Sequence, residues 1–251
     1  MSAPATLTPP TIRSSGVARE VEYPYSDGRV LMDADPHANA IVAMRNQLQW
    51  NFESLSNVYV AGSLAVFYRE GDPRAVVAPD VFVALGVQKK ERKSYRIWDE
   101  AGVVPAFVVE VTSPSTTGRD ATSKQETYEQ MAVREYWRFD PTGLQIQEGL
   151  MGWRLETGRY ERVPGESAAG WYRSGVLGLE LRAEGWLLRF RDPRLGRDLM
   201  THLETNRALQ VSERKAEAEA SARLEAERER DEAKQRLREL QARLRLSSES
   251  G

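Results

Sequence analysis

Cysteine is absent from this chain of 251 residues, which excludes disulfide frameworks and thiolate zinc sites. Histidine is nearly absent as well: His37 and His202 are the only two, too few for a histidine-rich metal site. No apolar run approaches the length of a membrane-spanning helix, and the N-terminus lacks the basic region and apolar core of a signal peptide. These absences lead us to expect a cytoplasmic protein that has no membrane partner.

The charge of the chain shows no large excess of either sign. Its formal net charge is −2 at pH 7, so no overall electrostatic attraction to nucleic acid is expected. Any contact with nucleic acid must therefore be local. The hydrophobic fraction of 41% is ample for a packed core, and the length allows one good-sized domain with an extension.

Composition changes along the chain and predicts four regions. Residues 1–18 are rich in Ser, Thr, Pro and Ala, and we expect a disordered leader there. Residues 19–194 contain the apolar segments of a globular domain. Over residues 195–246 Arg and Glu dominate, with Ala and Leu as the main apolar residues, which predicts a charged helical extension. Residues 247–251 are expected to form a short disordered tail.

The charged extension has an imperfect heptad pattern. Apolar residues occupy heptad positions near its two ends, but charged residues occupy the seam between them. A single solvated helix and a coiled coil are therefore both open. The second alternative would join two copies of the chain as a homodimer.

The order of elements predicts an α/β fold. A helical spacing of apolar residues follows Asp35-Pro36, and short β-branched or aromatic runs bounded by Gly and Pro predict strands. Along the chain we expect helix, strand, strand, strand, helix and strand at residues 36–55, 58–68, 76–85, 107–110, 120–132 and 136–140. This order is typical of a mixed sheet flanked by helices. Short strands between residues 144 and 190 are expected to extend the edge of that sheet.

Two acids lie in apolar, strand-like segments. Asp80 is in the middle of the run from Val76 to Leu85, and Glu110 ends the run that begins at Phe107. Ionised carboxylates on buried neighbouring strands are costly and repel each other, and a bound divalent cation relieves both penalties. Mg²⁺ or Mn²⁺ suits such oxygen ligands. With a lysine from the following helix, the acids form a site suited to metal-assisted phosphodiester hydrolysis.

Three segments resemble a known family. They are YSDGRVLMDADPHANAI, VVAPDVFVALG and PAFVVEVTSPSTTGRDATSKQETYEQMAVREYWRFDP, and together they are similar to the Uma2 family of restriction endonuclease-like proteins. That family belongs to the PD-(D/E)XK nuclease superfamily, and the similarity covers roughly residues 20 to 200. The resemblance implies a restriction-endonuclease-like mixed sheet, an Mg²⁺ or Mn²⁺ cofactor and nucleic acid, DNA in the first place, as substrate.

The same resemblance implies roles for individual residues. Asp80 corresponds to the acid of the PD element and Glu110 to the (D/E) position, and the carbonyl of Val111 is implied as a further metal ligand. The lysine that usually stands two residues after the Glu is Thr112 here. Lys124, on the helix that follows, is the candidate that takes over its catalytic role.

Three further residues are candidates for accessory roles. His37 resembles the histidine near the start of the family's first helix, although a lone histidine there is more often a surface or hydrogen-bonding residue. Glu53, expected on the same helix, is a candidate third acid, with an exposed glutamate as the ordinary alternative. Tyr128 follows Lys124 by four residues, so the two share a helix face, and Tyr128 is expected to pack against the sheet rather than touch substrate.

The most basic stretch of the globular part, residues 88–96, follows the Asp80 segment. Loops that leave strand ends often carry binding function. Lysine and arginine side chains there would neutralise phosphates, a contact that weakens with salt. The candidate nucleic-acid-binding residues are Lys89, Lys90, Arg92 and Lys93, and the alternative is a solvated surface loop.

Two main classes of function are therefore open. The first is a metal-dependent endonuclease with a helical appendage. The second is a catalytically inactive nuclease-like fold that serves as a binding or assembly module through its C-terminal helix. A metal hydrolase acting on a phosphoester other than nucleic acid is a third.

Overall fold

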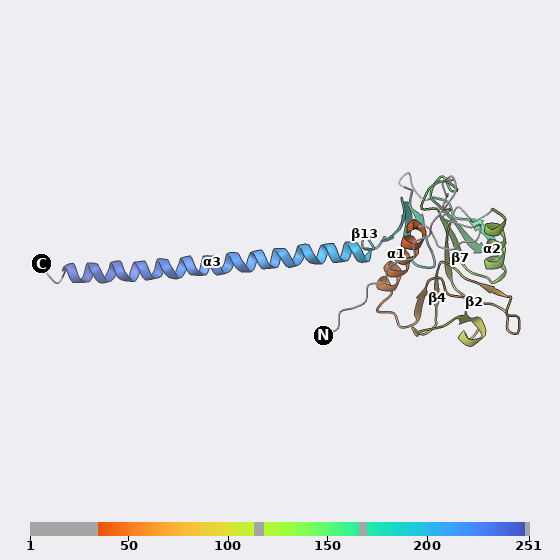
Figure 1. Cartoon of the computed structure of the whole chain (residues 1–251), viewed down its shortest axis with the longest axis horizontal. Helices are drawn as coiled ribbons and strands as arrows, with labels where there is room; N and C mark the ends of the chain where they lie inside the picture. The colour runs from red at the N-terminus through yellow and green to blue at the C-terminus, as the bar shows by residue number, and fades with distance from the viewer. Residues whose placement is uncertain (1–34, 113–117, 166–169, 249–251) are drawn as a thin grey trace, which may run out of the picture. The chain divides into compact units, whose positions relative to one another are not determined.

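The computed structural model describes residues 35–112, 118–165 and 170–248 (Figure 1). The leader expected at residues 1–18 lies outside these residues, as does most of the tail expected at residues 247–251, of which residues 247 and 248 belong to the C-terminal helix. The described residues form the predicted mixed α/β fold around a central six-stranded sheet. Their helices are α1 (Asp35–Asn51), α2 (Gly118–Gln130) and α3 (His202–Ser248).

The central sheet has the strand order β1-β4-β6-β7-β8-β9. Its strands are β1 (Val58–Ala61), β4 (Val81–Leu85), β6 (Phe107–Val111), β7 (Glu135–Phe139), β8 (Leu150–Glu156) and β9 (Arg159–Arg162). β6 and β7 are parallel, whereas the other neighbouring pairs are antiparallel. A parallel pair needs a crossover connection, which α2 supplies. The sheet is therefore mixed, as the order of elements predicts.

The remaining described strands form two smaller sheets. One has the antiparallel order β10-β11-β12-β13, with β10 (Tyr172–Arg173), β11 (Glu180–Glu184), β12 (Leu187–Asp192) and β13 (Arg197–Asp198). The other has the order β3-β2-β5, with β3 (Val76–Val77), β2 (Val66–Phe67) and β5 (Tyr95–Arg96). A short 3-10 helix, Ile97–Glu100, follows β5.

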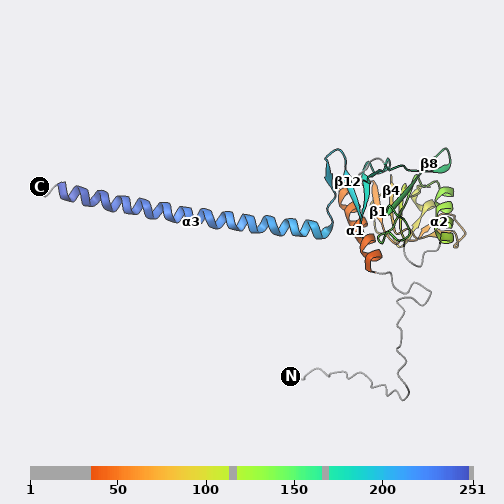
Figure 2. The same cartoon turned by 90° about the horizontal axis from the view of Figure 1, so that it is seen from above.

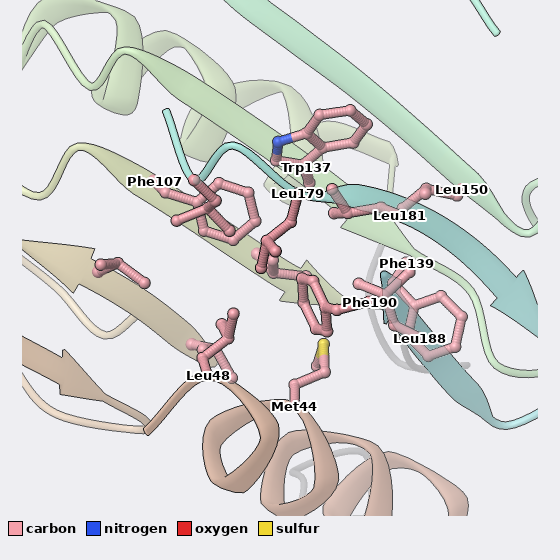
Figure 3. Close-up of a cluster of buried hydrophobic side chains, with 14 of the residues drawn as sticks. Met44, Leu48, Phe107, Trp137, Phe139, Leu150, Leu179, Leu181, Leu188 and Phe190 are labelled. Carbon is pink, nitrogen blue, oxygen red and sulfur yellow. The ribbon is translucent and has the colours of Figure 1, made fainter. Parts of the chain in front are cut away.

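Side chains of β6 alternate between two apolar clusters on opposite faces of the central sheet. Phe107 and Val109 belong to the cluster with α1 and the β10–β13 sheet, where Met44 and Phe190 also lie (Figure 3). Val108 belongs to the other cluster, together with α2 and the three-stranded sheet. The helices α1 and α2 thus flank the sheet on opposite sides (Figure 1 and Figure 2). Burial on both faces explains why β6 is apolar at nearly every position.

A close contact between neighbouring strands requires glycine at one position of the central sheet. Gly152 on β8 lies opposite Trp137 on β7. A Cβ atom on Gly152 would lie 2.3 Å from the Trp137 ring, a distance that no real Cβ contact shows. Trp137 is fully buried, and its indole ring fills the space that a side chain on Gly152 would need.

Three expectations about strands were wrong in detail. The run from Val76 to Leu85 is split into β3 and β4, because the chain leaves one sheet and enters another at Pro79-Asp80. Asp80 therefore stands just before β4 and not inside a strand. The segment 58–68 is likewise split, into β1 and β2. Only β8 and β9 extend the central sheet, since the later strands bury leucine and phenylalanine side chains against α1 as a separate sheet.

The long C-terminal helix α3 has 47 residues and begins at His202, slightly later than expected. Thr201 and Glu204 form a reciprocal capping box: the Thr201 N–H donates to Glu204 Oε2 at 2.7 Å, and the Glu204 N–H donates to Thr201 Oγ1 at 3.2 Å. Arg189 of β12 donates to both Glu204 carboxylate oxygens at 2.9 Å. From residue 206 to 239 the side chains are exposed. Across the described ranges, no helix combines the length and apolar character that crossing a bilayer requires.

Candidate functional site

The pairing of β4 with β6 brings the two predicted acids together. Val81 lies opposite Val109, so Asp80, one residue earlier, falls beside Glu110, one residue later on the antiparallel partner. The Glu110 carboxylate lies on the side of the sheet that α2 covers, because Lys124 and Tyr128 of α2 reach it. Asp80, just before β4, and Glu110, on β6, therefore lie next to each other.

Glu110 is buried and held at both oxygens. Lys124 Nζ donates to its Oε2 at 2.9 Å, and the Tyr128 hydroxyl donates to its Oε1 at 2.6 Å. Burial raises the pKa of Glu110 to about 7, with a further rise from the negative charge of Asp80, while Lys124 and Tyr128 act in the opposite direction. The carboxyl group of Glu110 therefore changes its charge near neutral pH.

Asp80 is tied to the end of β6 and faces a histidine. Its Oδ2 accepts a hydrogen bond from the Val111 N–H at 2.8 Å. His37, buried near the start of α1, places Nε2 at 3.1 Å from the Val111 carbonyl oxygen and at 3.7 Å from Asp80 Oδ2. His37 thus joins the predicted site through both a predicted acid and the predicted carbonyl ligand.

The donor atoms at this point fit a hard divalent cation. The carboxylates of Asp80 and Glu110 and the carbonyl of Val111 are oxygen ligands of the kind that Mg²⁺ and Mn²⁺ take. The negative charge of Asp80 is among the causes that raise the Glu110 pKa, so the two acids repel each other, a cost that a bound cation would reduce. In the described part of the chain, no three or more His, Cys, Asp or Glu side chains gather at one metal-sized point. The set consists of two side chains and one backbone carbonyl.

Thr112 occupies the position of the family's usual lysine. Its side chain is buried, and its Oγ1 has no hydrogen-bond partner among the residues that the structure describes. The ammonium group at Glu110 comes instead from Lys124, one and a half turns into α2. This is the placement that the resemblance implies for Lys124.

Tyr128 has a contact that the sequence analysis missed. It packs against the sheet as expected, with its ring fully buried beside Tyr136. Its hydroxyl also binds Glu110, which we did not expect. The spacing of four residues between Lys124 and Tyr128 was the signal, because it directs both side chains to the same carboxylate.

The environment of Glu53 differs from that of Asp80 and Glu110. It follows α1 by two residues, and its side chain is 80% exposed. Its carboxylate lies 3.9 Å from Lys89 Nζ, at the edge of an ion pair. This environment matches the ordinary alternative, an exposed surface glutamate.

The basic loop is more firmly attached to the domain than its composition indicates. Arg92 is only 3% exposed, donates to both oxygens of Glu100 at 2.9 Å and lies 4.1 Å above the Tyr59 ring. Lys89 donates to the carbonyls of Phe52 and Glu53 at 2.6 and 2.7 Å. Two lysines complete the loop: Lys90, which is half exposed and 3.3 Å from Glu100, and Lys93, which is exposed.

Comparison with known proteins identifies the family of this chain. The model of the Uma2 family, described as "Putative restriction endonuclease", matches residues 12–184. No curated protein matches the chain. A similar solved structure is that of "a putative nuclease belonging to DUF820" from Anabaena variabilis, with 15% identity, a TM-score of 0.40, and coverage of 57% of this chain and 77% of that chain. Because the family match spans well over half of the sequence, the chain belongs to the Uma2 family.

Proposed function

We propose that this protein is a metal-dependent endonuclease that hydrolyses phosphodiester bonds of DNA with Mg²⁺ or Mn²⁺. One observation carries the proposal: Asp80, just before β4, lies beside Glu110 of the neighbouring strand β6, and Lys124 Nζ lies 2.9 Å from Glu110 Oε2. Two carboxylates with a neighbouring ammonium group suit phosphodiester hydrolysis. Membership of the Uma2 family supports a nuclease that acts on nucleic acid.

Each residue of the site has a distinct task in this proposal. Asp80, Glu110 and the Val111 carbonyl would hold the cation, which when bound polarises a phosphoryl oxygen and lowers the pKa of a water molecule. Lys124 offsets the negative charge that develops on the phosphate, or orients the attacking water. Tyr128 keeps Glu110 in place through its hydroxyl. Glu110 holds a cation only when ionised, so metal affinity should rise with pH through about 7.

The test compares four proteins purified in the same way: wild type, Asp80→Asn, Glu110→Gln and Lys124→Ala. Each is incubated with supercoiled, linear and single-stranded DNA in Mg²⁺ or Mn²⁺. Loss of either carboxylate should abolish cleavage, and Lys124→Ala should lower the rate more than DNA binding, because its contact strengthens in the transition state. Equal residual cleavage in all four would identify a contaminating nuclease and reject the proposal.

The lysines of the basic loop are proposed to contact DNA phosphates. Lys89, Lys90 and Lys93 lie on one loop and keep exposed surface, whereas Arg92 is committed to Glu100. Replacing the three lysines with Gln should weaken DNA binding and flatten its dependence on salt. Lys215→Gln, Lys234→Gln and Arg223→Gln combined, all at exposed positions of α3, control for the loss of three positive charges. Unchanged affinity and salt slope in the loop variant would reject the contact.

The inactive-module alternative has its own observation in α3. The helix carries exposed apolar side chains among its charges, namely Leu203, Leu209, Val211, Leu224 and Leu237. Together with Thr112 at the lysine position, they favour an assembly role in which two copies associate through α3 as a homodimer. Sedimentation analysis of the full chain distinguishes a dimer from a monomer.

A further inference from the structure

A groove of about 910 Å³ lies between α1, β1 and the basic loop. β1 is an edge strand of the central sheet, so one side of it is not covered by another strand. α1 contributes Arg45 and Gln49 to the lining, β1 contributes Val58–Ala61, and the loop contributes Lys89 and Lys90. Positively charged side chains therefore stand at more than one point along the groove, together with two acids, Glu53 and Glu91.

The end of the groove at Gly62 touches the backbone of Asp80. A Cβ atom on Gly62 would lie 2.8 Å from the Asp80 carbonyl oxygen and 3.5 Å from Arg45 Cδ. The adjacent Ser63 N–H donates to the same Asp80 oxygen at 3.1 Å. Arg45 and the Asp80 backbone therefore both lie against Gly62, which lines the groove.

Arg45 differs from the other cations that line the groove. Lys89 is hydrogen-bonded to two carbonyls, and Lys90 and Arg92 pair with Glu100. The Nε of Arg45 is buried and has no hydrogen-bond partner in the part of the chain that the structure describes. A buried donor on a charged group is costly to leave unsatisfied. Arg45 also lines the groove, so an anion seated there would pair with the charge of its guanidinium group.

We propose that Arg45 binds a backbone phosphate of the DNA strand next to the phosphate that is cleaved, and that the groove guides this strand along β1. A guanidinium group presents a planar fork of donors that matches two oxygens of one phosphate. Arg45 beside Asp80, followed by Lys89 and Lys90, suits a polyanion with repeated phosphates better than a single small anion. The inference rests on the proposed endonuclease function and adds a strand-positioning residue to it.

The experiment measures binding without cleavage. Fluorescence anisotropy with a labelled DNA duplex and the corresponding single strand, in EDTA, gives the affinity at several salt concentrations. Arg45→Gln should weaken binding by about tenfold and reduce the slope of log affinity against log salt by about one. Arg223→Gln, at an exposed position of α3, removes the same charge and should change neither quantity as much. Melting temperatures of all variants check the fold.

The outcomes separate this inference from the proposed function. Equal affinity and slope for Arg45→Gln and Arg223→Gln would overturn the role of Arg45 and leave the Asp80 and Glu110 proposal standing. If Arg45→Gln melts early, Arg45→Lys decides: weaker binding at an unchanged melting temperature supports the guanidinium contact, and wild-type affinity overturns it. If wild type binds neither DNA, the inference and the endonuclease proposal fail together.

Discussion

The raised pKa of Glu110 predicts a stability that depends on pH in a direction unusual for a carboxyl group. Burial and the neighbouring Asp80 raise this pKa from 4.5 to about 7 in the folded chain. The neutral form is therefore favoured by folding. Its contribution to stability is fully present below the unfolded pKa and is lost as the pH rises through about 7.

The size of the effect follows from the shift. Each pKa unit corresponds to about 1.36 kcal/mol, so the change from 4.5 to about 7 amounts to roughly 3 kcal/mol. In Glu110→Gln the side chain no longer titrates. Without divalent cations, the unfolding free energy of wild type relative to Glu110→Gln should therefore fall by roughly this amount between about pH 4.5 and about pH 7.

Urea unfolding in EDTA at several pH values measures this difference, with Glu148→Gln, an exposed glutamate, as the control for net charge. Asp80→Asn removes one of the causes of the shift, so it should lower the Glu110 pKa and make the fall smaller. In the same buffer, Asp80→Asn should be neutral or stabilising, because it relieves repulsion. Parallel curves for wild type and Glu110→Gln would refute the reasoning.

Three further outcomes follow from contacts around the site. Tyr128→Phe removes the donor to Glu110, so it should raise the Glu110 pKa further and cost about 1–3 kcal/mol in urea unfolding; unchanged stability would contradict the contact. Gly62→Ala should cost about 1–3 kcal/mol, because its Cβ meets the Asp80 carbonyl, and should weaken the metal-induced rise in melting temperature; wild-type behaviour would show that the backbone adjusts freely. Ending the chain after Arg214 keeps the contact between Arg189 and Glu204, so cooperative unfolding should persist, and sedimentation will show whether a dimer is lost.

The sequence is most informative where local pattern and burial coincide. β6 could be predicted because its residues are buried on both faces, which leaves a continuous apolar run with Glu110 as the exception. Asp80 drew attention as an acid within the apolar run from Val76 to Leu85. The spacing of Lys124 and Tyr128 was also informative, because a separation of four residues places both side chains on one face of a helix.

The remainder depends on partners that are distant in the sequence. Pro79 is the one sign within Val76–Leu85 that the chain changes sheets, because proline cannot donate a hydrogen bond to a neighbouring strand, and the two halves are otherwise equally apolar. The sequence alone predicts a surface cation at Arg92, because its partners Glu100 and Tyr59 are identified only by the structure. No sequence pattern singles out Arg45, because its proposed role depends on the groove and on the nearby Asp80 backbone, which only the structure shows.

The capping box at the start of α3 has a consequence for how that helix melts. Helix formation is limited by the first turn, which fixes several residues for a single hydrogen bond. In α3 that turn is already held by Thr201 and by Arg189 of the folded domain. The rest of the helix can therefore propagate from this preformed first turn without a separate nucleation step. On warming, helix content should be lost from the C-terminal end toward His202, and amide hydrogen exchange should slow in the same direction.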